Sequence, residues 1–175
     1  MSEQSLTERH SENQLYVVLG MHRSGTSALS RALKVFNIDH GDNLVEAGFD
    51  NVHGFWETWD IVHINDKVLA TSQLYWDSPG YFSQASLSSE EIQPLLMEAA
   101  ELIKTKLQRF HQWCFKDPRT IRVLPFWLKI FEMLSVEPKF LLVKRNPLDV
   151  AESLKKRDQM PIEKGLLLWF LHNYP

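Results

Sequence analysis

Residues 20–27 carry the strongest chemical signal in the sequence. They read Gly-Met-His-Arg-Ser-Gly-Thr-Ser, directly after an apolar run that is rich in β-forming residues and before a segment with helical spacing of apolar residues. A turn of this kind points successive backbone N–H groups inward, and the helix N-terminus adds partial positive charge. The combination predicts a loop that binds a phosphate group.

The loop differs at one position from the pattern of nucleoside triphosphatases, which is Gly, four residues, Gly-Lys and then Ser or Thr. Both glycines and the hydroxyl of Ser27 match, but Thr26 replaces the lysine that reaches the β- and γ-phosphates. Positive charge comes instead from Arg23, inside the loop. The sequence therefore favours a ligand with fewer phosphate groups and a cation near the bond that breaks. The alternative is a plain turn with a solvated arginine, which the flanking strand and helix disfavour.

A second segment, residues 140–153, repeats the order of an apolar strand, a basic end, a proline-containing turn and a helix. Arg145 ends the strand and Ser153 lies in the second turn of the helix, so the two side chains can face one pocket. Asn146 and Pro147 are typical of a helix start, with Asn146 as the expected N-cap, and Asp149 is interpreted as the structural acid of this helix. Taken alone, this segment has an ordinary structural explanation.

Together the two segments resemble the sulfotransferases that use 3′-phosphoadenosine 5′-phosphosulfate as donor. Residues 23–27 match the family's loop, Lys or Arg followed by Ser-Gly-Thr and Ser or Thr, and the second segment matches its Arg- and Ser-bearing motif. Gly-Phe-Trp-Glu at 54–57 and Lys-Asp-Pro-Arg at 116–119 resemble elements of bacterial members. The resemblance implies a three-layer α/β/α fold with a parallel sheet, of the P-loop nucleoside triphosphate hydrolase type, over residues 15–175.

The resemblance also implies which residues hold the donor. The 5′-phosphosulfate is expected on Arg23, Ser24, Gly25, Thr26 and Ser27. The 3′-phosphate is expected on Arg145 and Ser153. No metal ion is required for this chemistry, because the transferred sulfuryl group carries less charge than a phosphoryl group.

Sulfuryl transfer needs a base that takes the acceptor's proton. Glu57 is the predicted base, because it lies among aromatic residues where partial burial raises the pKa of a carboxyl group. Several sulfotransferases use a Glu in this segment and others use a His. His53 and His63 are therefore the alternatives, and Asp60 is a weaker one.

Lys116 is the second predicted catalytic residue, beside Arg23. It ends a predicted strand, and the carboxyl ends of parallel strands line the ligand crevice. It also resembles the lysine of the family's Lys-x-Pro element, which stabilises the sulfuryl group, and Arg119 is expected to reach donor or acceptor. Asp117 leaves a second function open, a P-loop kinase or ATPase that holds Mg²⁺ there, although the missing loop lysine disfavours it.

Alternating strands and helices predict the α/β fold that positions these residues. Strands are expected at 15–19, 113–115 and 139–143, and helices at 24–35, 61–70, 89–110, 123–134, 147–156 and 162–173. Ser88 or Ser89 is the expected cap of the longest helix. Residues 1–14 are expected to form a disordered tail, and residues 15–175 a single domain.

Composition narrows the classes of partner. The net charge of −3 indicates no general attraction to nucleic acid or to an anionic membrane. Cys114 is the only cysteine, so no intrachain disulfide can form. Neither a signal peptide nor a membrane span is expected from the apolar runs. These features predict a soluble cytoplasmic protein.

Members of the resembled family usually continue past the last predicted helix with a strand and a segment that closes over the adenosine. Without them, an open sheet edge is expected, which a second copy of the chain could cover as a homodimer. A nucleotide-binding module without catalysis is therefore a third hypothesis. The acceptor is expected to be a small molecule or a glycan, with Trp56, Trp59 and Trp76 as candidate walls, although core packing is the default for each.

Overall fold

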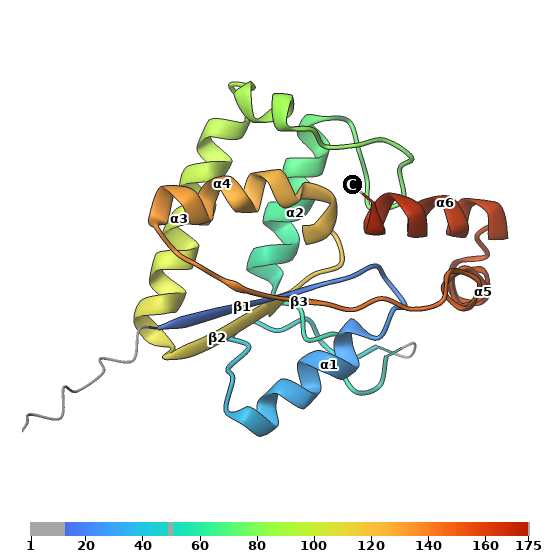
Figure 1. Cartoon of the computed structure of the whole chain (residues 1–175), viewed down its shortest axis with the longest axis horizontal. Coiled ribbons are helices and arrows are strands. Elements are labelled where there is room, and N and C mark those ends of the chain that lie inside the picture. The colour runs from blue at the N-terminus through green and yellow to red at the C-terminus, as the bar shows by residue number, and fades with distance from the viewer. Residues whose placement is uncertain (1–12, 49–50, 175) are drawn as a thin grey trace, which may run out of the picture.

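A three-stranded parallel sheet in the order β2-β1-β3 forms the centre of the protein (Figure 1). The structure is a computed structural model, which describes residues 13–48 and 51–174 of the chain. The strands are β1 (Gln14–Leu19), β2 (Gln112–Lys116) and β3 (Lys139–Leu142). In register, Val18 pairs with Lys116 on one side and with Leu141 on the other. The carboxyl ends of the three strands therefore lie at the same edge of the sheet.

Six α-helices connect and flank the strands. They are α1 (Thr26–Leu33), α2 (Trp59–Thr71), α3 (Ile92–Arg109), α4 (Leu124–Leu134), α5 (Pro147–Asp158) and α6 (Ile162–Asn173). Three short 3₁₀ turns accompany them, η1 (Lys34–Phe36), η2 (Gln84–Ser88) and η3 (Thr120–Val123). Every predicted strand and α-helix is present, with ends that differ from the prediction by at most three residues.

Side-chain alternation along β1 builds two separate cores. Leu15, Val17 and Leu19 pack with residues of α2, α3 and α4. Tyr16 and Val18 pack with residues of α1 on the opposite face. Figure 1 shows α1 on one side of the sheet and α2, α3 and α4 on the other. The chain is thus an α/β protein with a parallel sheet between helices, compatible with the predicted three-layer arrangement.

A third, smaller core joins α5 and α6 to the loop that follows β1. Its buried members are Met21, Val150, Leu154, Met160, Leu168 and Leu171. The two helices approach closely at Gly165, where an added Cβ would lie 2.9 Å from the Cα and the Cβ of Ala151. Because Met21 belongs to the predicted phosphate loop, the packing of these helices also helps to position that loop.

Helix ends confirm one predicted cap and show that the other was wrong. Asn146 caps α5, since its side chain accepts a hydrogen bond of 2.9 Å from the backbone N–H of Leu148. Ser88 belongs to η2, and the hydroxyl of Ser89 accepts from the backbone N–H two residues further on. These serines complete a separate turn, and α3 therefore begins at Ile92 without a side-chain cap.

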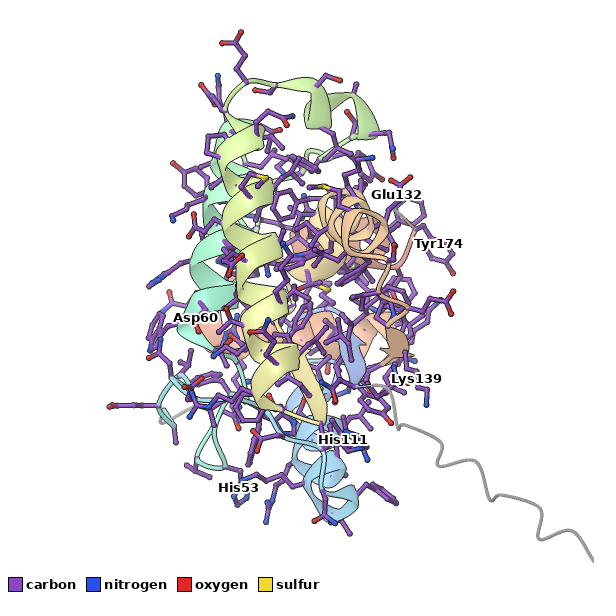
Figure 2. The ribbon with its side chains drawn as sticks, turned by 90° about the vertical axis from the view of Figure 1, so that its left-hand side faces the viewer. His53, Asp60, His111, Glu132, Lys139 and Tyr174 are labelled. Carbon is purple, nitrogen blue, oxygen red and sulfur yellow. The ribbon has the colours of Figure 1, made fainter. Side chains whose placement is uncertain are left out.

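The edges of the described structure bear on three further predictions. Of the predicted tail, residues 1–12 lie outside the described residues, and Gln14 already belongs to β1. Within the described residues, β3 pairs with β1 on one side and has no strand on the other, with Phe140 and Leu142 exposed. Figure 2 shows Lys139 of this strand near the outside of the molecule. No described helix is long and apolar enough to cross a bilayer.

We expect Gly165→Leu to lower the free energy of unfolding by about 1–3 kcal/mol, because a side chain at this crossing overpacks the contact between α5 and α6. Urea denaturation followed by circular dichroism measures the change. Lys155→Leu adds the same side chain at an exposed position of α5, and should change the free energy by less than about 0.5 kcal/mol. Equal losses in the two variants would contradict the close crossing.

Candidate functional site

A pocket of about 280 Å³ lies where the carboxyl ends of β1 and β2 meet the N-terminus of α1. Its lining includes seven of the residues that the sequence predicted as site residues: Arg23, Gly25, Thr26, Ser27, Glu57, Lys116 and Arg145. They come from four segments that are far apart in the chain. The pocket thus occupies the crevice where open α/β sheets bind their ligands.

The loop after β1 depends on two glycines. Gly20 has a φ of 151°, and a Cβ there would lie 2.6 Å from the carbonyl oxygen of Val143, just beyond β3. Gly25 has a φ of 95° directly before α1, and its Cβ position has open space around it. Arg23 also adopts a positive φ, 65°, at a cost of about 1 kcal/mol for a residue with a side chain. The backbone therefore turns tightly around the N-terminus of α1.

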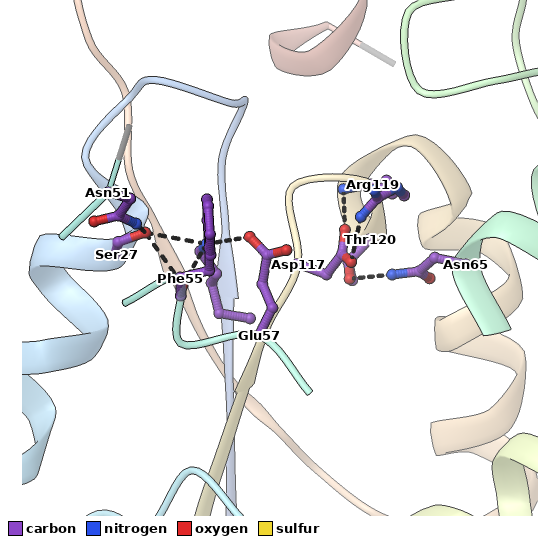
Figure 3. A network of polar contacts seen from close by, with 9 residues as sticks. Ser27, Asn51, Phe55, Glu57, Asn65, Asp117, Arg119 and Thr120 are labelled. Carbon is purple, nitrogen blue, oxygen red and sulfur yellow. Dashed lines mark hydrogen bonds and ion pairs between the residues drawn. The ribbon is translucent and has the colours of Figure 1, made fainter. Parts of the chain in front are cut away.

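Lys116 and Glu57 form a buried ion pair in the pocket, with 2.5 Å between Nζ and Oε1. The side chains are 2% and 11% exposed. The ammonium also donates to the carbonyl oxygen of Phe55 at 2.8 Å and to Ser27 Oγ at 3.3 Å. Figure 3 shows Ser27, Phe55 and Glu57 as members of this one network. The network ties the end of β2 to the first turn of α1.

The proton affinity of Glu57 is set mainly by burial, by Asp117 and by Lys116, and Arg119 lowers its pKa as the last of the causes. Burial raises its pKa, and the carboxylate of Asp117 raises the pKa further by repulsion. The ammonium of Lys116 opposes the rise, because it stabilises the charged carboxylate. A carboxylate with a raised pKa is a better proton acceptor near neutral pH, which suits the predicted base.

Asp117 is fully buried, and Arg119 occupies both of its carboxylate oxygens. The backbone N–H of Arg119 donates to Oδ1 at 2.6 Å, and its Nη1 donates to Oδ2 at 2.8 Å. Arg119 also forms an ion pair of 2.8 Å with Asp66. Nearby, the side chain of Asn65 donates to Thr120 at 3.0 Å, as Figure 3 shows. Asp117 therefore anchors the backbone after β2, and its oxygens face protein donors.

Arg145 and Ser153 contact the loop through Arg23. Arg23 Nε donates to Ser153 Oγ at 2.8 Å, and Arg145 Nη1 donates to the backbone carbonyl oxygen of Arg23 at 3.1 Å. Asp149 lies 3.5 Å from Arg145 Nε, which gives it a structural contact beside its place in the first turn of α5. The two motifs that the sequence singled out thus meet at one arginine.

Ser24 and the alternative bases lie elsewhere. Ser24 is buried, and its Oγ has no hydrogen-bond partner among the described residues. His53 lines a separate hollow along α1 together with Trp56, and His63 lines another beside Asp60. Figure 2 shows His53 near α1 and Asp60 at the beginning of α2. Of the proposed bases, only Glu57 lies in the pocket beside the loop.

Three contributors were missed by the sequence analysis. Asn51 donates from Nδ2 to Ser27 Oγ at 3.3 Å, and the backbone carbonyl of Phe55 accepts from Lys116. Neither follows from a recognisable pattern. Arg157, in the last turn of α5, also lines the pocket. It lies four residues after Ser153, and this helical spacing on one face was the available signal.

The charges of the lining fit an anionic ligand. Arg23, Lys116, Arg145 and Arg157 contribute four cationic groups, and Glu57 contributes the carboxylate in the lining. The N-terminus of α1 adds further positive potential. Among the described residues, no group of three or more His, Cys, Asp or Glu is placed to hold a metal ion. The arrangement can bind an anion and accept a proton beside it.

Comparison of the chain with protein-family models, with curated proteins and with solved structures finds no match.

We expect Lys116→Met to destabilise the protein by about 3 kcal/mol at pH 8, because it leaves the Glu57 carboxylate buried without its partner. Burial and Asp117 would then raise the pKa of Glu57 further above its ordinary value of about 4.3. The folded variant binds a proton that the unfolded chain has already lost, so its stability falls as pH rises through this window. Urea denaturation between pH 5 and pH 8 should show a loss that grows with pH.

Lys67→Met is the matched control. Lys67 pairs with Glu98 at 2.8 Å, but the two side chains are 53% and 47% exposed. Removing an exposed pair should cost about 1 kcal/mol or less, with little dependence on pH in this range. A pH-independent loss for Lys116→Met would show that Glu57 does not change its protonation when the lysine is removed.

Proposed function

We propose that this chain is a sulfotransferase of the P-loop type, which transfers a sulfuryl group from 3′-phosphoadenosine 5′-phosphosulfate to a hydroxyl group of a small-molecule or carbohydrate acceptor. One observation carries the proposal, the meeting of both motifs at Arg23. Its guanidinium contacts Ser153, and its backbone carbonyl accepts from Arg145. A loop that only bound a single phosphate would not need this second basic segment beside it.

Donor binding divides the residues into two groups. Backbone N–H groups of residues 23–27, with the side chains of Arg23 and Lys116, would hold the 5′-phosphosulfate. Arg145 and Ser153 would hold the 3′-phosphate. The excess of cationic groups in the lining, with Arg145 among them, supports an anionic ligand, and Ser153 is linked to the lining through its contact with Arg23.

In the transfer step, the acceptor oxygen forms a bond to sulfur, and the bond between sulfur and the bridging phosphate oxygen breaks. The electron pair of the broken bond leaves with adenosine 3′,5′-bisphosphate, and the acceptor's proton passes to Glu57. Lys116 and Arg23 would stabilise the negative charge that develops on the sulfuryl and bridging oxygens. Glu57 becomes a free acceptor as Lys116 turns from the carboxylate toward the sulfuryl group.

A kinase or ATPase that uses Asp117 as its Mg²⁺ ligand is less well supported. Both carboxylate oxygens of Asp117 already accept from Arg119, and the residue is fully buried. Thr26 stands where a triphosphatase has its lysine. A nucleotide-binding module without catalysis would use the same donor contacts, and turnover measurements separate it from the enzyme. The homodimer through the β3 edge and the cytoplasmic location stay predictions.

Isothermal titration calorimetry tests the donor site. We expect adenosine 3′,5′-bisphosphate to bind more tightly than adenosine 5′-monophosphate and than Mg-ATP. Arg145→Ala should weaken the bisphosphate by about ten- to a hundredfold, since it removes a charge-assisted contact to the 3′-phosphate. The affinity for the monophosphate, which lacks that phosphate, should change little.

Lys155→Ala is the control for loss of a positive charge. Lys155 is an exposed cation in α5, the helix that follows Arg145. The variant should leave all three affinities within about twofold. Tighter binding of Mg-ATP than of the bisphosphate would overturn the proposal and favour the kinase. Equal losses for bisphosphate and monophosphate in Arg145→Ala would remove the 3′-phosphate assignment.

Glu57→Gln tests the base. The variant should bind adenosine 3′,5′-bisphosphate as the wild type does, and should transfer sulfuryl groups roughly 10²–10⁴ times more slowly. The wild-type rate should rise with pH through the raised pKa of Glu57 and then level off, and the variant should lack this rise. Chromatographic detection of the bisphosphate product, with a mixture of glycosides and phenols as acceptors, measures both. Binding without turnover in either protein would identify an inactive nucleotide-binding module.

A further inference from the structure

A second hollow, of about 310 Å³, adjoins the phosphate pocket. Both are lined by His22, Phe55, Glu57 and Arg157, so the two spaces meet along these side chains. Glu57 lines both hollows, and Lys116, its ion-pair partner, lines the phosphate pocket but not the second hollow. A molecule in the second hollow would therefore lie against the carboxylate that is proposed to take a proton.

We propose that the second hollow binds the acceptor as an uncharged sugar unit, with Trp59 as its stacking platform and one hydroxyl group directed at Glu57. This inference rests on the proposed function for the identity of the reaction, and it adds the class of substrate. The volume of the hollow is at the lower end of small-molecule sites, which suits a single sugar ring.

The charges of the hollow argue against an anionic acceptor. Arg119 is neutralised by Asp117 and Asp66, each at 2.8 Å. Arg157 pairs with Asp158 at 2.8 Å, and Asp158 also lines the hollow. The lining of this hollow thus holds two arginines and two carboxylates, whereas the lining of the phosphate pocket holds four cationic groups and one carboxylate. An acceptor carboxylate or sulfate would therefore find no net attraction in this lining.

The walls combine an aromatic surface with a polar rim. Trp59, at the start of α2, is 40% exposed, and the ring of His63 lies 5.4 Å from its ring. Trp76 offers less free surface, because His22 and Arg157 both lie over or beside its ring at 4.5 Å and 5.7 Å. The C–H face of a sugar can pack on Trp59 while its hydroxyl groups form hydrogen bonds with the charged residues of the lining, which are Glu57, Arg119, Arg157 and Asp158.

A phenol fits the hollow less well, although it could also stack on the tryptophan. It offers one hydroxyl group, whereas Glu57, Asp158, Arg119 and Arg157 present several hydrogen-bonding groups around the space. Each of these groups already has a protein partner, but an apolar ring would displace water from their remaining hydrogen-bonding sites without replacing it, which costs free energy. A sugar replaces the lost water with its own hydroxyl groups.

The test uses the full chain and saturation-transfer difference NMR with three sets of probes. They are neutral methyl glycosides of glucose, galactose, mannose and N-acetylglucosamine, the methyl glycosides of glucuronic and galacturonic acid, and 4-nitrophenol. We expect at least one neutral glycoside to bind more tightly than every uronate and the phenol. Trp59→Ala should weaken that binding at least tenfold, and Trp59→Phe, which keeps an aromatic face, should retain most of it. Tighter binding of a uronate or of the phenol, or no binding of any neutral glycoside, would overturn the inference.

Phe36→Ala removes an exposed aromatic side chain of η1 that lines neither hollow, and should not change glycoside binding. Titration of adenosine 3′,5′-bisphosphate into the same samples separates the two proposals. Bisphosphate binding without any glycoside binding refutes the sugar site and leaves the sulfotransferase proposal standing. Trp59-dependent glycoside binding without bisphosphate binding supports the sugar site and refutes the proposed donor. Glycoside binding that persists in Trp59→Ala would place the sugar elsewhere and overturn the inference.

Discussion

A lysine ammonium that is almost completely buried needs a counter-charge, and Glu57 supplies it to Lys116 at 2.5 Å. Taking either charge out of water alone would cost several kcal/mol. The pair, together with the carbonyl of Phe55 and the hydroxyl of Ser27, satisfies the donors of the ammonium and fixes three segments against one another. The rest of the pocket is arranged around this ion pair. Lys116 at the end of β2 contacts Ser27 in the first turn of α1 and contacts Phe55 and Glu57 in the loop before α2.

The loop around α1 has a second support on its other side. Arg23 adopts a left-handed backbone conformation, and contacts to Arg145 and Ser153 hold it there. Behind it, Met21 is buried in the core between α5 and α6. The α5–α6 pair is therefore part of the site as well as part of the fold. A change in the packing of these helices would therefore also shift the loop that follows β1.

Two adjoining hollows with different charge follow from the same arrangement. The lining on the loop side has four cationic groups and one carboxylate, and the lining on the side toward Trp59 has two arginines and two carboxylates. Glu57 lines both. Such a division suits a reaction in which an anionic donor and an uncharged acceptor meet at one proton-accepting group.

Local features of the sequence determined the strands and α-helices, together with those helix starts that depend on neighbouring residues. Apolar periodicity located the three strands and six α-helices, Asn146 and Pro147 specified the start of α5, and the two glycines marked the loop. These signals are informative because side chains return to the same face every two residues in a strand and every three to four residues in a helix, so a short stretch of sequence shows the pattern. The prediction of a cap at Ser88 or Ser89 was wrong, because Ser88 belongs to the 3₁₀ turn η2 and the hydroxyl of Ser89 accepts from the backbone N–H of Glu91 before α3 begins.

The contacts between distant segments were decided only by the tertiary structure. The sequence favoured Glu57 as the base but left His53 and His63 open as alternatives, and the fold places Glu57 alone of these against Lys116. It also left Asp117 open as a metal ligand, whereas the turn after β2 brings Arg119 onto both oxygens. The physical reason is that a side chain's charge state and partners depend on burial and on groups from other elements, which residue type and spacing do not encode.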